Sequence, residues 1–439
     1  MKSVLAGCVL FSWSVSLAAQ TPRESALVAH SNEFKREVIR VTDGVFVAVG
    51  FGNANSILVV GDAGRIIVDT MEGDDAARDV KAEFDRISRA PVRAIIYTHG
   101  HPDHILGSDV MAGRDNPVVY AQAAFSSEQL GANPARAAIV PRSLRQFGVE
   151  LSPADRPNLG VGPALRMDWT GKDTFLTPTH LVEERLDVVV AGVRLSLVRA
   201  PGENPDEMYV FLPDKSVLLP GDNYYHAFPN LAPIRGNSYR DPRVWASSLT
   251  RILGEGAEYL VPSHTRPVIG KDEVRRRLTG YRDAILSVWE QTIDGINRGL
   301  TPDQLVEVVK LPEELARAPY LQQFYGTVPW SVRSIYAGTL GWFDGNPTHL
   351  FPLSARERAR RTLDVVGGEA KLLSLSRNAL SKGDVQWALE LVDHLLALDA
   401  SHPEGRSLKA EALETLGRDQ SSANGRNYYL SVARELRRR

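Results

Sequence analysis

The chain has 439 residues, of which 43% are hydrophobic and 24% are charged. This balance is typical of a globular protein, and the length favours two or three domains. The formal net charge of -2 argues against nucleic acid or an anionic membrane surface as a partner. The totals therefore leave enzymes, binding proteins and scaffolds as the classes to separate.

The first 19 residues have the features of a secretory signal peptide. Lys2 provides a positive charge, residues 4–15 are mainly apolar, and the small residues 18–19 offer a cleavage site. The apolar stretch is too short for a transmembrane span, so we expect a periplasmic or secreted protein without stable membrane insertion. The single cysteine, Cys8, would leave with the signal, which excludes a disulfide or a thiolate-bound metal in the mature protein.

Strand-like and helix-like patterns alternate over the first half of the mature chain. An amphipathic helix is expected over residues 74–88, and the apolar run 92–97 after it is typical of a buried strand. This order predicts α/β layering, with a loop-bearing insertion over residues 113–185. Further strands are expected over residues 45–49, 56–60, 66–69, 186–200, 209–212, 217–220 and 260–262, and a helix over 243–253.

Beyond about residue 270, amphipathic helices replace the strand patterns. Helices are expected over 363–380, 385–398 and 403–416, and the last two resemble a tetratricopeptide unit. About one and a half repeats are present, too few for a solenoid. We divide the chain into a signal peptide (1–19), an α/β domain (20–270) and an α-helical domain (271–439).

Three histidines and an aspartate lie within six residues, directly after the strand expected over 92–97. His99 and His101 are two apart and can point at one metal ion, whereas Asp103 and His104 can reach a second. Imidazole and carboxylate ligands suit Zn²⁺. A lone histidine is usually a structural or surface residue, but that reading does not explain four ligand-type residues at this spacing.

This segment resembles the HxHxDH signature of the metallo-β-lactamase superfamily. The resemblance implies a four-layer αββα sandwich, with two zinc ions per chain bound by loops at one edge. It also implies three further ligand segments, which we locate at Glu203, Asp222 and His264. The implied metal ligands are His99, His101, Asp103, His104, Glu203, Asp222 and His264.

The downstream segments are similar to the alkylsulfatase branch of that superfamily. Most superfamily members carry His where this chain has Glu203, and alkylsulfatases carry Glu; Glu207 stays an alternative ligand. Alkylsulfatases usually have Glu at the position of Asp222. Residues 340–347 and 426–436 also match alkylsulfatase stretches, which implies a helical, tetratricopeptide-like domain that forms a homodimer.

The resemblance further implies an anionic substrate, an alkyl sulfate ester. Glu203 in place of a neutral histidine lowers the charge of the metal site by one, so a cation is needed to attract the sulfate. Arg235 lies in a segment similar to the sulfate-binding segment of alkylsulfatases, where Asn230 could add a hydrogen bond. The expected catalytic residues are Asp103, Arg235, Asn230 and His226. A surface ion pair for Arg235 and a structural role for His226 remain open.

The expected function is hydrolysis of alkyl sulfates by a zinc-dependent alkylsulfatase, with attack on sulfur and attack on carbon both open. A lactonase or lactamase on the same fold is the first alternative, and Glu203 and the helical motifs argue against it. The second is a non-catalytic periplasmic scaffold built on the helices, which the complete ligand set argues against.

Overall fold

The computed structural model describes residues 20–125, 134–167 and 174–438. The predicted signal peptide, residues 1–19, lies outside the described residues. Within them, no helix combines the length and the apolar composition needed to cross a membrane.

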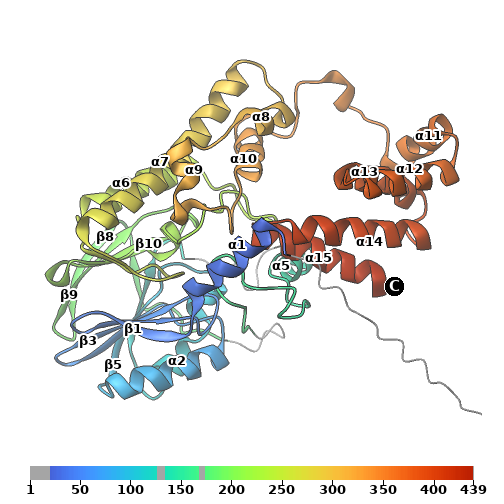
Figure 1. Cartoon of the computed structure of the whole chain (residues 1–439). Coiled ribbons are helices and arrows are strands. Elements are labelled where there is room, and N and C mark those ends of the chain that lie inside the picture. Colours follow the sequence, from blue (N-terminus) through green and yellow to red (C-terminus); the bar gives the residue numbers. More distant parts are fainter. Residues whose placement is uncertain (1–19, 126–133, 168–173, 439) are drawn as a thin grey trace, which may run out of the picture.

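Two β-sheets pack face to face in the blue-to-green part of the molecule, at the lower left of Figure 1. The first sheet has seven strands in chain order, β1 to β7, and the second runs β13-β12-β11-β10-β9-β8. The first sheet consists of β1 (Glu37–Thr42), β2 (Val45–Val49), β3 (Ser56–Gly61), β4 (Gly64–Val68), β5 (Val92–Ile96), β6 (Val118–Gln122) and β7 (His180–Val182). The second consists of β8 (Arg185–Val190), β9 (Val193–Arg199), β10 (Met208–Leu212), β11 (Val217–Leu219), β12 (Tyr259–Leu260) and β13 (Val268–Ile269).

Apolar side chains fill three layers around these sheets. Ile57 and Val68 of the first sheet pack against the inner face of the second, with Leu197 among their neighbours. Helix α2 (Asp74–Ile87) covers the outer face of the first sheet, and α6 (Pro242–Gly254) covers that of the second. This αββα layering confirms the expected sandwich, because each sheet buries one face against its partner and the other against helices.

One expected strand, 186–200, is wrong as a single element. The structure forms a hairpin there, in which β8 and β9 pair antiparallel around Ala191 and Gly192. Both turn residues have positive φ, +52° and +85°, as tight hairpin turns require. The Ala-Gly pair interrupts the apolar run without breaking its alternation, which is why the pattern suggested one strand.

Helices follow the sandwich and confirm the expected helical C-terminal region. Helix α7 (Lys271–Asn297), α8 (Pro302–Val308) and α10 (Val328–Leu340) share the core on the outer face of the second sheet, so packing is continuous across residue 270. The remaining helices of this region are α9 (Glu313–Arg317), α11 (Ala355–Val366), α12 (Glu369–Ser381), α13 (Val385–Leu398), α14 (Pro403–Arg418) and α15 (Ala423–Arg438).

Helices α11 to α13 lie away from the sandwich, α14 runs back toward it, and α15 lies beside α14 (Figure 1). The helix expected over 363–380 is wrong, because Gly367 and Gly368 separate α11 from α12 with φ of +92° and +94°. Helix α15 packs on α5 (Arg136–Gln146), which belongs to the expected insertion. The C-terminal helix is thereby brought next to the α/β part of the chain.

Candidate metal centre

All seven candidate ligands lie in segments that follow strands at one edge of the sandwich. Residues 99–104 follow β5, Glu203 follows β9, Asp222 follows β11 and His264 follows β12. Neighbouring strands that run in the same direction end at the same edge of a sheet, so ligands far apart in the chain converge. His99, His101, His104, Glu203, Asp222 and His264 are each at most 5% exposed.

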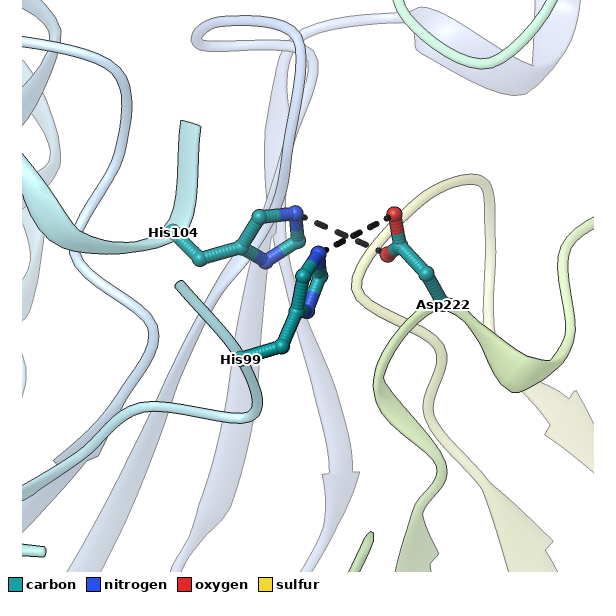
Figure 2. Close-up of side chains that lie close together, drawn as sticks. All are labelled: His99, His104 and Asp222. Carbon is teal, nitrogen blue, oxygen red and sulfur yellow. Dashed lines mark ion pairs between the residues drawn. The ribbon is translucent and has the colours of Figure 1, made fainter. Parts of the chain in front are cut away.

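Asp222 lies between two groups of histidines. Its carboxylate oxygens are 3.8 Å from His99 Nε2 and 3.6 Å from His104 Nε2, and Figure 2 shows the three side chains pointing toward one another. The same carboxylate is 3.2 Å from His264 Nε2. Asp222 is therefore placed where one carboxylate can serve two neighbouring sites.

The other ligands extend the cluster on both sides of Asp222. Asp103 lies 3.7 Å from the Nε2 atoms of both His104 and His264, and the ligand atoms of these three residues fall within 4.8 Å of one another. On the other side, His101 Nδ1 is 2.6 Å from His99 Nε2. The structure thus brings the histidines and aspartates predicted from the sequence into one cluster.

Glu203 and Glu207, the two alternatives for one ligand, occupy different positions. Glu203 faces the cavity above the cluster, and burial raises its pKa to about 7 against the opposing effect of Arg240. Glu207 accepts hydrogen bonds from the backbone N–H groups of Asn204 and Asp222. Its carboxylate therefore holds the backbone behind Asp222, which favours Glu203 as the ligand.

The cluster contains buried polar atoms that have no hydrogen-bond partner within the described residues: His101 Nε2, His104 Nε2, Glu203 Oε2 and Asp222 Oδ1. Buried nitrogen and oxygen atoms normally have partners. These atoms converge from three segments of the chain, and their chemistry is that of zinc ligands. The residues present therefore fit bound zinc.

Residues behind the cluster orient the histidine rings. Asp69, fully buried at the end of β4, lies 2.8 Å from His104 Nδ1 and accepts hydrogen bonds from Thr98. The backbone oxygen of Asn53 lies 2.8 Å from His264 Nδ1. Each contact turns Nε2 toward the cluster, which is how metal-binding histidines are usually held.

The carboxylates also set the charge state of the cluster. Burial lowers the pKa of His264, but nearby Asp222 and Asp103 outweigh burial and raise it to about 9. A proton or a metal cation therefore stabilises this group of carboxylates. Metal binding would replace that proton, since the ligand must be neutral imidazole.

A cavity of about 440 Å³ opens above the cluster. Its polar end is formed by His101, Asp103, Glu203, Asp222 and His264, together with Arg235 and Tyr325. Its other walls are largely apolar and include Leu106, Ile139, Val140, Phe147, Leu165 and Phe175. A ligand with one charged end and one apolar end matches this lining.

The three expected catalytic residues that are not metal ligands lie at different positions relative to the cavity. Arg235 lines the cavity, and its Nη1 is buried without a hydrogen-bond partner among the described residues. Asn230 is buried beside the cavity rather than in its lining, and neither amide atom of its side chain has a partner there. His226 lies outside the lining, with Nδ1 3.1 Å from Glu33 Oε1.

Sequence reasoning missed Arg240. This arginine is 3% exposed, forms an ion pair with Glu203 and donates a hydrogen bond to the backbone oxygen of Asn230 at 2.7 Å. The positive charge of Arg240 offsets the negative charge that Glu203 adds to the metal site. The charge argument called for a cation, and Arg240 lies five residues after Arg235, so the same argument could have included it.

Comparisons with known proteins agree with this architecture. Residues 49–264 match the family model of the metallo-beta-lactamase superfamily, and residues 301–439 match that of alkyl sulfatase dimerisation. The chain is 40% identical over 383 residues to a linear primary-alkylsulfatase from a Pseudomonas species, covering 85% of this chain and 72% of the relative. It is 32% identical over 403 residues to an (R)-specific secondary-alkylsulfatase from Pseudomonas, covering 88% of this chain and 60% of the relative.

A solved structure is similar over nearly the whole chain. The stereoselective inverting sec-alkylsulfatase from Pseudomonas superposes with a TM-score of 0.86 at 30% identity, covering 95% of this chain and 67% of the other. Sequence identity, both family models and the fold therefore agree, and the chain belongs to the alkylsulfatase family of the metallo-β-lactamase superfamily.

Proposed function

We propose that the protein is a binuclear zinc hydrolase that cleaves alkyl sulfate esters to an alcohol and inorganic sulfate. The observation that carries the proposal is the cavity, which joins the ligand cluster, apolar walls and Arg235, whose Nη1 has no hydrogen-bond partner among the described residues. The alkylsulfatase names of the relatives support the same substrate class.

Two groups of ligands would hold the zinc ions. His99, His101 and Glu203 would bind one ion, Asp103, His104 and His264 would bind the other, and Asp222 would be shared. Zinc in such a site lowers the pKa of water to about 7 and supplies a nucleophile at neutral pH. Arg240 pairs with Glu203, so this pair carries no net charge and replaces the neutral histidine found in most of the superfamily.

The chain's own side chains would bind and orient the ester. Arg235 presents a planar guanidinium that can donate two parallel hydrogen bonds to sulfate oxygens. The apolar walls, which include Ile139 and Phe175, would exclude water and receive the alkyl group. This arrangement would hold the sulfate beside Arg235 and leave the carbon chain against the apolar walls.

Arginine substitutions test this function. We expect Arg235→Ala to lower kcat/KM for dodecyl sulfate by about 3 kcal/mol, because a charged contact with the substrate is lost. Arg235→Lys should recover only part, since a point charge cannot make the paired contact. The control is Arg243→Ala, which removes an exposed arginine of α6, and zinc content is measured in every variant.

Two outcomes would contradict the proposal in different ways. Near-wild-type turnover by zinc-loaded Arg235→Ala would remove Arg235 from the site. Failure of the zinc-loaded wild type to hydrolyse any primary or secondary alkyl sulfate would reject the substrate class and favour a lactonase-type activity.

The helical region would form a homodimer, in keeping with its match to the dimerisation family. Trp342, Phe351 and Val365 are 75%, 95% and 88% exposed, which is unusual for large apolar side chains grouped in one part of the chain. Sedimentation should give a dimer that Phe351→Asp weakens and Val244→Asp, an exposed position of α6, leaves unchanged. A monomeric wild type at micromolar concentration would contradict the dimer.

We also propose that the protein is exported, as the signal-like residues 1–19 suggest. Fractionation of expressing cells, with N-terminal sequencing of the product, should find a chain that begins near residue 20 outside the cytoplasm. A full-length chain in the cytoplasm would contradict export.

A further inference from the structure

Helix α5 holds the loop that carries Arg235 through three contacts. Gln146 Oε1 accepts a hydrogen bond from the backbone N–H of Arg235 at 2.9 Å. Arg142 donates two hydrogen bonds to the backbone oxygen of Ile234, at 3.1 and 2.5 Å. The ring of Phe147 lies 5.8 Å from the Arg235 guanidinium, within range of a cation–π interaction.

Arg235 itself lacks the contacts that usually fix an arginine. Its Nη1 is buried without a hydrogen-bond partner, and the structure shows no ion pair for it among the residues described. Its position therefore depends on the support of its backbone and on the ring of Phe147. Gln146 is fully buried, and among the residues that the structure describes its Nε2 has no partner, so its side chain makes one hydrogen bond there, with Arg235.

The C-terminal helix α15 in turn holds α5. Arg145 donates two hydrogen bonds to the Glu435 carboxylate, both at 2.8 Å, which is the paired geometry of a strong arginine contact. Gly148, just after α5, has φ of +57°, and a Cβ there would lie 3.0 Å from Asn427. Helix α5 is thus packed tightly against α15 although it belongs to the long insertion.

From these contacts we propose that Gln146 is a positioning residue, which holds Arg235 over the metal ligands so that its guanidinium meets the sulfate group. The inference rests on the proposed role of Arg235 in the alkylsulfatase reaction. Small displacements of a group that contacts the substrate lower catalytic efficiency strongly. Helix α15 extends this support, so the dimerisation region contributes to the substrate site without touching the substrate.

The test is a double-mutant cycle on alkyl sulfate hydrolysis. Gln146→Met keeps the volume of the side chain and removes the acceptor, so KM for dodecyl sulfate and the inhibition constant of inorganic sulfate should both rise about tenfold, as expected for one lost buried hydrogen bond. In the Arg235→Ala background, Gln146→Met should add nothing, because its effect passes through Arg235. Zinc content should stay at the wild-type level in all three variants.

Gln291→Met is the matched control. Gln291 on α7 also accepts a hydrogen bond from a loop backbone N–H, that of Lys310 at 3.3 Å, but it lies outside the cavity lining. Its loss should lower stability without raising KM or the inhibition constant.

The outcomes separate this inference from the proposed function. If Arg235→Ala loses activity but Gln146→Met keeps wild-type KM and sulfate inhibition, the positioning role is wrong and the sulfate site stands. If Gln146→Met lowers activity equally in both backgrounds, its role is structural. If Arg235→Ala binds sulfate normally, the proposed sulfate site is wrong, and the positioning role of Gln146, which acts through that site, is wrong with it.

Discussion

Two regions of this protein bury charged side chains in different ways. One is the metal-ligand cluster around Asp222. The other is the contact between α1 (Pro22–His30) and residues near the C-terminal end of the chain, which we call the clasp. In the clasp, fully buried Arg426 donates hydrogen bonds to Glu24 at 2.7 Å and to the backbone oxygen of Asp155 at 2.9 Å.

The two regions differ in the source of the partners for their buried charged groups. The charges of the clasp are paired within the chain, although one Arg426 nitrogen remains unpaired. The cluster instead has several ligand atoms without partners among the described residues, and its two aspartates, Asp103 and Asp222, raise the pKa of His264. Burial of a charge is costly unless a partner offsets it, so the clasp contributes to folding, whereas the cluster requires a cation from outside.

Loss of a ligand should have the largest effect. We expect His264→Ala to retain about one zinc ion and to lose at least about a thousandfold in kcat/KM, because one ion loses one of its two histidine ligands. Metal analysis and hydrolysis assays check this, with His180→Ala, an exposed histidine of β7, as the control that keeps both ions. Two tightly held ions in His264→Ala would contradict the ligand assignment.

Breaking the clasp should change stability and not metal content. Arg426→Met leaves Glu24 buried without its partner and should lower the free energy of unfolding by about 3 kcal/mol. Arg23→Met removes an exposed ion pair between α1 and Asp419 and should cost less than about 1 kcal/mol. Denaturant unfolding measures both variants. Loss of zinc from folded Arg426→Met would show that the two regions are not independent.

A smaller, pH-dependent effect is expected at His30 in the clasp. Burial lowers its pKa from 6.5 to about 4, and its Nε2 lies 2.8 Å from the backbone oxygen of Gly160. His30 therefore binds a proton more readily in the unfolded chain than in the folded protein. The contribution of neutral, buried His30 to the free energy of unfolding is complete above pH 6.5 and falls as the pH drops toward 4.

The measurement compares unfolding free energies at pH 7 and pH 5. Wild type should lose about 2 kcal/mol more than His30→Gln over this interval, because only wild type has the buried imidazole. Equal losses in the two proteins would show that folding does not lower the pKa of His30.

Local sequence patterns and the family resemblance predicted the layers and pointed to the candidate ligands. Residues 99–104 carry four ligand-type side chains at a spacing that a single loop after a strand can present to metal ions. Glu203, Asp222 and His264 were located through the resemblance to the metallo-β-lactamase superfamily, which implies further ligand segments that each follow a strand. Such patterns depend on neighbours in the chain, so they are visible without the structure.

Only the tertiary structure decided how charged and polar residues far apart in the chain are paired. Arg240 with Glu203, Gln146 with Arg235 and Arg426 with Glu24 are separated by 37, 89 and 402 residues. Their sequence surroundings contain no period or motif that identifies a partner. Packing of the insertion and of α15 against the sandwich brings these residues together, because buried charges and amides must find partners in whatever surface closes over them.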